Sequence, residues 1–253
     1  MKSIAIVGKG GTGKTAITTL IAKVLVEDYN FKLLLIDADP THPHLSHMVD
    51  LIPQISLEDI RNKVINKAMK KQNDLDQIAE NIDYELYNAI QERKEFSLLY
   101  IGNPTAPGCF CPSNSLLRKV IESISKDFEI ILIDCEAGLE QINRKVIQSV
   151  EIILIVSDMS IRSLKTAHSI KEMAKKFTNY KHLGVILNKV KGDIDLLLDK
   201  MKDLDLSLFG TIHDSNTILE FEMSGKPLIK IPINSDLLAQ IRPMVEKIIN
   251  YGE

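Results

Sequence analysis

The sequence has no excess of positive charge, no long apolar segment and few cysteines. Its 31 lysines and arginines are outnumbered by 34 aspartates and glutamates, so the composition does not suggest a nucleic-acid partner. No uninterrupted apolar run approaches the ~20 residues that span a bilayer. Met1 and Lys2 lead straight into an apolar run without a signal-peptide pattern, and the chain has only three cysteines. We therefore expect a cytoplasmic protein with no stable membrane insertion.

The chain otherwise has the composition of an ordinary globular protein, with 253 residues that are 45% hydrophobic and 26% charged. Apolar, β-rich runs alternate with helix-forming stretches, which predicts a doubly wound α/β fold. Because these runs are continuous, we expect strands buried on both faces of a mostly parallel sheet. The predicted strands are residues 4–7, 32–36, 98–101, 130–133, 152–156, 183–187 and 208–212, and the predicted helices are residues 14–27, 115–125, 141–149, 161–177, 194–201 and 236–250.

The prediction is a single domain over residues 1–253, with one departure from the alternating pattern at residues 56–95. This stretch is polar, rich in Lys, Asn, Gln and Glu, and mostly helix-forming. It is either a solvated helical excursion between strands or a surface that caps the ligand site or docks a partner. The sequence does not separate these interpretations.

The most informative motif follows the first predicted strand, where residues 8–15 read Gly-Lys-Gly-Gly-Thr-Gly-Lys-Thr. Glycines allow the backbone to approach an anion, and successive N–H groups at a helix start surround phosphates. Lys14 can reach the β- and γ-phosphates, and the Thr15 hydroxyl can ligate Mg²⁺. The pattern predicts a P-loop NTPase that binds ATP or ADP. The predicted loop residues are Gly8, Gly10, Gly11, Thr12, Gly13, Lys14 and Thr15.

Acidic residues follow two other predicted strands, at the sheet edge where ligands of open α/β sheets bind. Asp37 and Asp39 are two residues apart and share a side if the strand continues. Asp134 follows four apolar residues, as in a Walker B strand, and is expected to hold Mg²⁺ through a water. Asn188 ends a later strand, and its amide can both donate to and accept from an adenine edge.

The second lysine of the loop, Lys9, is not needed by an ordinary P-loop. The run Lys-Gly-Gly-x-Gly-Lys-Thr resembles the deviant P-loop of the MinD/ParA/nitrogenase-iron-protein class. The resemblance implies a homodimer in which Lys9 reaches the partner's nucleotide, with Lys9, Lys14 and Asp39 as the catalytic residues. It places Asp39 at switch I, where it orients the attacking water, and Gly138 at switch II. It also implies nucleotide contacts by Asp37, Asp134, Asn188, Lys189, Pro232, Ile233 and Asn234.

A Cys-x-Cys pair, Cys109 and Cys111, follows a Gly- and Pro-rich loop. A disulfide between residues i and i+2 is strained, and two thiolates do not complete a tetrahedral metal site. A dimer would bring four sulfurs to its symmetry axis. The remaining interpretation is that the two cysteines are structural packing residues.

In this context the Cys-x-Cys resembles the CooC-type nickel-insertion ATPases, which serve maturation of carbon monoxide dehydrogenase and, in related members, acetyl-CoA synthase. The resemblance implies that a dimer binds Ni²⁺ or Zn²⁺ at Cys109 and Cys111 of both chains and delivers the metal to such a client enzyme. The third cysteine, Cys135, follows the Walker-type Asp134 directly, whereas the nitrogenase iron protein has a cluster cysteine at the position of Ala137. We therefore expect Cys135 to be a packed strand-end residue.

Two features leave alternatives open. His42, His44 and His47 could bind a divalent metal, but we favour exposed polar residues on a mobile loop. The competing function is a MinD/ParA-like positioning or adaptor ATPase without metal cargo. The C-terminal segment 236–253 lacks the basic face expected for binding anionic lipid.

Overall fold

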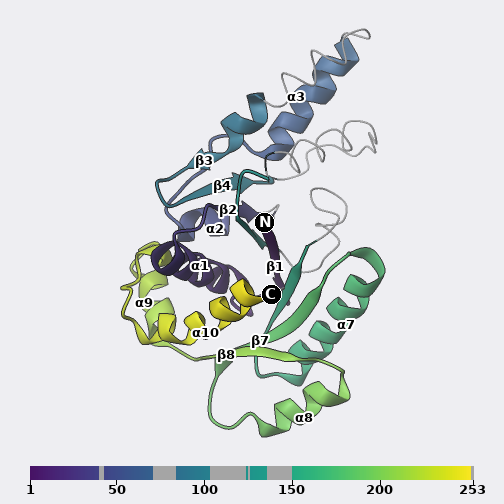
Figure 1. Ribbon diagram of the computed structural model, residues 1–253, viewed down its shortest axis with the longest axis vertical. Coiled ribbons are helices and arrows are strands. Elements are labelled where there is room, and N and C mark those ends of the chain that lie inside the picture. The colour runs from purple at the N-terminus through teal and green to yellow at the C-terminus, as the bar shows by residue number, and fades with distance from the viewer. Residues whose placement is uncertain (40–42, 71–83, 103–123, 125, 136–149, 252–253) are drawn as a thin grey trace.

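A computed structural model describes residues 1–39, 43–70, 84–102, 124, 126–135 and 150–251. The described strands form one eight-stranded sheet in the order β3-β4-β2-β5-β1-β6-β7-β8. Only the β3–β4 pair is antiparallel among the described strands. Figure 1 shows helices on both sides of this sheet, which confirms the predicted doubly wound α/β fold. The strands are β1 (Lys2–Gly8), β2 (Leu33–Asp37), β3 (Gln91–Glu92), β4 (Phe96–Tyr100), β5 (Ile130–Asp134), β6 (Ile152–Ser157), β7 (His182–Val190) and β8 (Leu208–His213).

All seven predicted strands are present, although several ends differ by a few residues. The predicted helix 14–27 is a regular helix that ends in a π-helical turn, η1 (Leu25–Tyr29). The predicted helices 115–125 and 141–149 lie outside the described residues, apart from residue 124. The helices are α1 (Lys14–Val24), α2 (His44–Met48), α3 (Leu57–Lys70), α7 (Ile161–Phe177), α8 (Asp195–Asp203), α9 (Asn216–Met223), the 3₁₀ turn η2 (Leu228–Lys230) and α10 (Asp236–Asn250).

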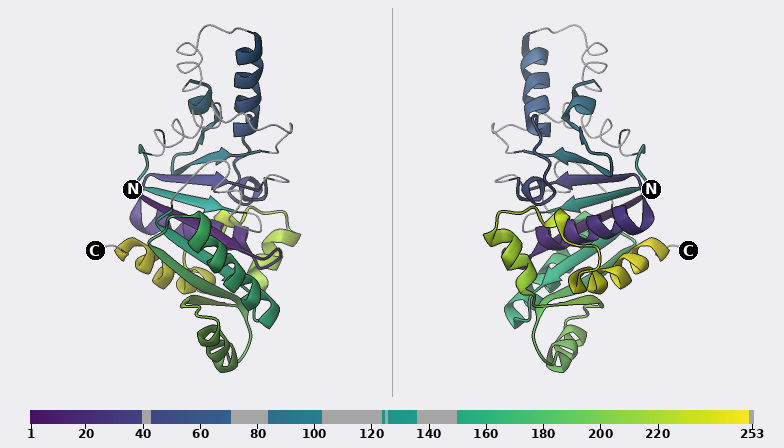
Figure 2. Two further views of the ribbon diagram at one scale, coloured as in Figure 1. Left: turned by 90° about the vertical axis from the view of Figure 1, so that its right-hand side faces the viewer. Right: turned by 90° about the vertical axis from the view of Figure 1, so that its left-hand side faces the viewer.

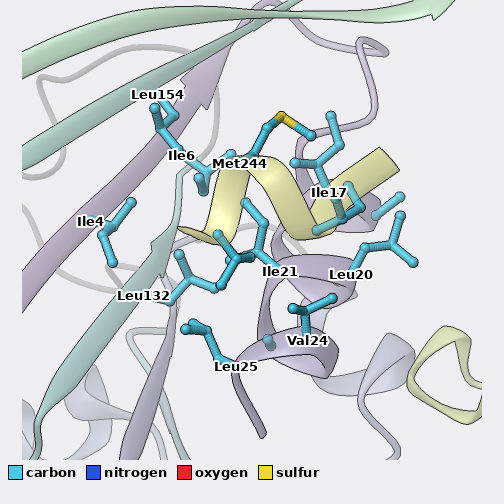
Figure 3. Packing of buried hydrophobic residues seen from close by; sticks show 14 of the residues in the cluster. Ile4, Ile6, Ile17, Leu20, Ile21, Val24, Leu25, Leu132, Leu154 and Met244 are labelled. Atoms are coloured by element: carbon cyan, nitrogen blue, oxygen red, sulfur yellow. The ribbon is translucent and has the colours of Figure 1, made fainter. Parts of the chain in front are cut away.

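The central strands β1, β2, β5 and β6 are largely apolar because both faces of the sheet are buried there. In β1, Ile4 and Ile6 face α1 and α10, whereas Ala5 and Val7 belong to the core on the opposite face. Figure 3 shows Ile17 and Ile21 of α1 packed between these strands and α10. The two cores hold the sheet rigidly, so the loops at its carboxyl edge are built on a fixed base.

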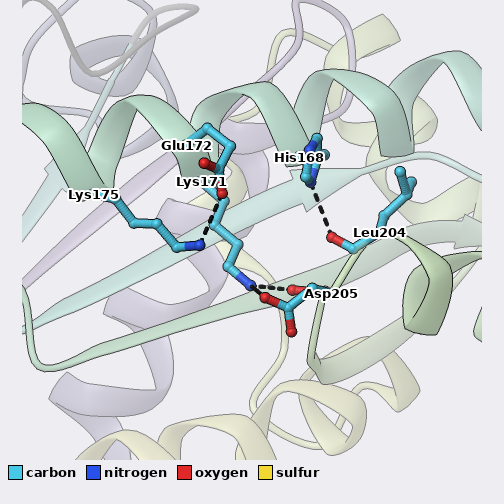
Figure 4. Close-up of polar contacts among 6 residues, drawn as sticks. All are labelled: His168, Lys171, Glu172, Lys175, Leu204 and Asp205. Atoms are coloured by element: carbon cyan, nitrogen blue, oxygen red, sulfur yellow. Dashed lines mark hydrogen bonds and ion pairs between the residues drawn. The ribbon is translucent and has the colours of Figure 1, made fainter.

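Polar contacts connect α7 to the turn that follows α8. The His168 Nδ1 atom lies 3.0 Å from the Leu204 carbonyl oxygen, and the Lys171 ammonium lies 2.6 Å from the Asp205 carboxylate (Figure 4). Exposed ion pairs stabilise little, so these contacts mainly orient the turn. None of the described helices is long and apolar enough to cross a membrane.

Helix α3 stands away from the sheet at its β3–β4 end, as Figures 1 and 2 show. Ser56 caps it: its hydroxyl donates to Asp59 Oδ2 at 2.7 Å and accepts from the Asp59 N–H at 3.2 Å. Leu57 and Ile60 are buried in the core and anchor the first turn. In the described part of the 56–95 stretch, α3 is thus anchored at its start and projects outward, which fits its polar composition.

Candidate nucleotide site

The P-loop connects β1 to α1 in a conformation that needs its glycines. Gly8, Gly11 and Gly13 have φ values of 148°, 79° and 92°. A Cβ atom on Gly8 would lie 2.3 Å from the Val156 carbonyl oxygen, so β6 leaves no room for a side chain there. Gly13 forms the N-cap of α1, and the helix therefore begins with free N–H groups directed at the loop.

Two side chains from the end of β7 brace this loop. Asn188 is 3% exposed, and its Nδ2 atom donates to the Thr12 carbonyl oxygen at 2.8 Å. The Lys189 ammonium donates to the Gly11 carbonyl oxygen at 3.2 Å. The structure therefore gives Asn188 a role that the sequence did not predict, because its amide fixes the loop that receives the phosphates. The predicted adenine contact of Asn188 stays a prediction.

The loop forms the floor of a cleft of about 690 Å³. This volume suits a nucleotide-sized ligand. The lining residues from the predicted set are Gly10, Gly11, Gly13, Lys14, Thr15, Asp39, Asp134, Asn188 and Lys189. A second wall, which the sequence did not predict, comes from the end of β8 and from α9: His213, Asp214, Ser215, Ile218, Leu219 and Glu222.

The predicted turn Pro232, Ile233 and Asn234 is exposed and is not part of this lining. Its base contact therefore stays a prediction. No described residue of the 56–95 stretch lines the cleft either. The interpretation of that stretch as a cap over the ligand thus gains no support from its described part.

Two buried carboxylates lie side by side at the carboxyl edge of β2 and β5. Asp37 and Asp134 are register partners in neighbouring parallel strands, and their exposures are 0% and 2%. Burial, together with the Asp134 charge, raises the pKa of Asp37 to about 7. Burial also raises the pKa of Asp134 to about 6, against hydrogen bonds from Thr15 and Thr18 and the charge of Lys14 that lower it. Thr18 Oγ1 donates to Asp134 Oδ1 at 3.0 Å.

These groups fit a bound Mg²⁺. The cation prefers oxygen ligands and keeps several waters, so one hydroxyl and a carboxylate beside the phosphates suffice. Thr15 supplies the hydroxyl, and Asp134 supplies a buried carboxylate whose ionised form a cation would stabilise. Elsewhere, no described group of three or more His, Cys, Asp or Glu side chains could hold a metal ion.

The residues with predicted catalytic roles are two lysines of the loop, Lys9 and Lys14, and Asp39. Asp39 lines the cleft. The Lys14 ammonium donates to the Lys9 carbonyl oxygen at 3.3 Å and therefore lies over the loop. The pKa of Asp158 is lowered overall: burial raises it, but hydrogen bonds from Ser160 and the charges of Lys9 and Lys189 lower it by more. Both lysines therefore interact electrostatically with the Asp158 carboxylate.

Several predicted residues lie outside the described part of the chain: Gly138, Cys109, Cys111 and His42. The other two histidines belong to the short helix α2, so the loop that we expected for them is wrong. Pro43 precedes α2, and Leu45, a completely buried residue of α2, packs this helix against the sheet. Both histidines are exposed, as expected, and His44 also lines the cleft.

Cys135 is almost fully buried, as expected for a packed strand-end residue, although it also borders the cleft. Its exposure is 2%, and it belongs to the core on the α7 side of the sheet. Burial, with a smaller effect of the Asp134 charge, raises the pKa of the thiol well above its ordinary value. The thiol is therefore protonated at neutral pH and is a poor metal ligand.

Comparison with known proteins agrees with this geometry. The family described as CobQ/CobB/MinD/ParA nucleotide binding domain matches residues 4–228. An uncharacterized ATP-binding protein of Methanocaldococcus jannaschii is 35% identical over 98% of both chains. The carbon monoxide dehydrogenase accessory protein CooC of Rhodospirillum rubrum is 29% identical over 88% of this chain and 87% of its own. The structure of the septum site-determining protein MinD of Pyrococcus horikoshii, complexed with Mg-ADP, has a TM-score of 0.71 at 24% identity and covers 98% of this chain and 96% of its own.

A glycine-rich loop with its lysine, two buried carboxylates and a nucleotide-sized cleft define a P-loop nucleotide site. The chain therefore belongs to the CobQ/CobB/MinD/ParA nucleotide-binding family and is a P-loop ATPase of the MinD/ParA class.

Proposed function

We propose that this chain is a homodimeric, Mg-ATP-hydrolysing metallochaperone. The observation that carries the nucleotide part is the buried Asp134 carboxylate, which lines the cleft together with Lys14 and Thr15 of the P-loop and has the buried Asp37 as its register partner. Buried carboxylates with raised pKa values favour a bound cation, and the loop favours a phosphate chain. Mg²⁺ would be held by Thr15 and, through a water, by Asp134, and would neutralise charge that develops on the phosphates.

The proposed reaction is the transfer of the γ-phosphoryl group of ATP to water, which yields ADP and phosphate. The P-loop N–H groups and Lys14 hold the phosphates and stabilise the charge of the transition state. Asp39 lines the cleft and would orient the attacking water. Lys9 of a second copy would add positive charge when two chains close on the nucleotides. The backbone N–H of Gly138 would contact the γ-phosphate and lose this contact after hydrolysis.

The proposed cargo is Ni²⁺ or Zn²⁺, bound by Cys109 and Cys111 of both chains. Two observations support it: the Cys-x-Cys spacing and the similarity to CooC, which extends over 87% of that protein. Two chains together offer four thiolates, the number that a tetrahedral site of a soft metal needs. The client would be a nickel enzyme such as carbon monoxide dehydrogenase or acetyl-CoA synthase.

A second candidate is a nucleotide-switched positioning or adaptor ATPase without metal cargo. The structural similarity to MinD, with a TM-score of 0.71, favours it. This candidate keeps every nucleotide residue and treats Cys109 and Cys111 as packing residues. The two proposals differ in one measurable quantity, the amount of metal bound per dimer.

Native mass spectrometry of the reduced protein with Ni²⁺ or Zn²⁺, with and without ADP or ATP, tests the cargo. We expect one metal ion per dimer in the wild type and in Cys135→Ala, and none in Cys109→Ser. A nucleotide-dependent dimer in which Cys109→Ser retains its metal, or in which the wild type binds none, would favour the positioning or adaptor function.

Lys9→Ala tests the role of a second copy in hydrolysis. We expect this variant to bind nucleotide but to lose ATP-dependent dimerisation and turnover, because its charge acts on the partner's nucleotide. The exposed Lys176 of α7 provides the matched control, Lys176→Ala, which should behave as the wild type. Normal turnover by Lys9→Ala would refute the closed-dimer mechanism.

A further inference from the structure

The Asp37 carboxylate holds both ends of the connection that leads from β2 to α2. Its Oδ1 atom accepts from the Asp39 N–H at 3.3 Å, just before residues 40–42. Its Oδ2 atom accepts from the Ser46 N–H at 3.3 Å and from the Ser46 hydroxyl at 3.2 Å, just after them. One buried carboxylate thus ties together the two ends of the segment that begins at Asp39.

The Ser46 end of this contact is rigid. Ser46 is completely buried, and its neighbours in the core are Leu45 and Val49, which are also 0% exposed. These two apolar side chains hold α2 against the face of the sheet that α1 covers. A hydroxyl fixed in this way has one set of partners, and it keeps the Asp37 carboxylate in a single orientation.

The Asp39 end of the contact is the part that reaches the cleft. The Ala38 N–H donates to the Asp134 carbonyl oxygen at 2.9 Å, so the backbone before Asp39 is tied to β5 as well. Asp39 lines the cleft, whereas Asp37 and Ser46 do not. The backbone of Asp39 is therefore held by residues that do not line the cleft.

We propose that Ser46 is a positioning residue for ATP hydrolysis, acting through Asp37 on the backbone of Asp39. The inference rests on the proposed hydrolytic function. Because Ser46 lies behind the cleft, its loss affects how Asp39 is held and leaves the surface that binds the nucleotide unchanged. Loss of the hydroxyl should therefore lower kcat and leave KM unchanged.

Steady-state ATPase kinetics of Ser46→Ala tests this proposal. We expect kcat to fall about tenfold, which corresponds to about 1.4 kcal/mol, while KM for Mg-ATP stays within about twofold of the wild type. Ser46→Thr keeps the hydroxyl and should restore most of the rate. If Ser46→Ala does not fold, Ser46→Cys replaces it, because a thiol has a similar shape and is a weaker donor.

Ser3→Ala is the matched control. Ser3 is 6% exposed, and its hydroxyl accepts one hydrogen bond, from the Glu151 N–H at 3.1 Å, at the start of β1 and away from the cleft. We expect thermal unfolding to show a similar loss of stability in Ser3→Ala and Ser46→Ala, with kcat reduced only in the latter.

The outcomes separate this inference from the proposed function. An active wild type with an unchanged kcat in Ser46→Ala, or equal losses in both serine variants, would overturn the positioning role alone. A rise in KM at constant kcat would also overturn it. A wild type that binds Mg-ATP but never hydrolyses it would overturn the proposed function and this inference with it.

Discussion

Replacement of Asn188 by alanine should destabilise the protein even when no nucleotide is bound. The side chain is 3% exposed and donates to the carbonyl oxygen of Thr12, a residue that is itself 0% exposed. Loss of a buried hydrogen bond that leaves its partner unsatisfied costs about 2 kcal/mol. For a chain of this size, each kcal/mol shifts Tm by roughly 2–4 °C, so we expect a fall of about 4–8 °C.

Thermal unfolding followed by circular dichroism without nucleotide measures this effect. Asn250→Ala, at the exposed end of α10, is the control and should change Tm little. Asn188→Asp should be worse than Asn188→Ala, because it turns an acceptor toward the Thr12 carbonyl oxygen and buries a charge. An unchanged Tm in Asn188→Ala would refute the bracing role and leave adenine contact as the only function of this side chain.

Three further predictions concern the buried acid, the core and the P-loop. Without Mg²⁺ and nucleotide, the free energy of unfolding of the wild type should fall, relative to that of Asp37→Asn, as pH rises from 3.8 to about 7. The reason is that the folded protein keeps a proton on Asp37 that the unfolded chain releases. Urea unfolding at a series of pH values measures this, and parallel curves for the two proteins would contradict it. Ile21→Ala should lower the free energy of unfolding in urea by about 2–5 kcal/mol, since this fully buried side chain packs between α10 and the sheet. A loss below about 1 kcal/mol would show that the surrounding side chains fill the cavity. Gly8→Ala should abolish binding of a fluorescent ATP analogue, since the added Cβ would lie 2.3 Å from the Val156 carbonyl oxygen. Retained binding would show that the backbone of β6 can move to accommodate the methyl group.

The sequence predicts the strands well because burial on both faces leaves continuous apolar runs. It misses β3, whose two residues Gln91 and Glu92 are polar and pair only along one edge. It also misses α9, which has no buried residue and therefore lacks the apolar periodicity that predicts a helix. The loop expected for His44 and His47 is wrong because Leu45 and Val49 anchor a short helix there, which two apolar residues are too few to predict.

The P-loop is predictable because its chemistry lies in consecutive residues. The contacts that support it are not predictable, because they join residues far apart in the sequence. The hydrogen bond from Asn188 to Thr12 spans 176 positions, and the one from Thr18 to Asp134 spans 116. Only the order of the strands brings these partners together. For the same reason the hydrogen bonds that Asp37 accepts from Asp39 and Ser46 could not be predicted, and the expected nucleotide contact of Asp37 stays a prediction.

The near-complete burial of Cys135 has a practical consequence for experiments. Alkylating reagents attack thiolates, and Cys135 is only 2% exposed and has a thiol pKa well above its ordinary value. Brief alkylation of the native protein should therefore report on Cys109 and Cys111 without interference from the remaining cysteine. A reporter group could be attached to the Cys-x-Cys segment of the natural sequence, with no cysteine removed beforehand.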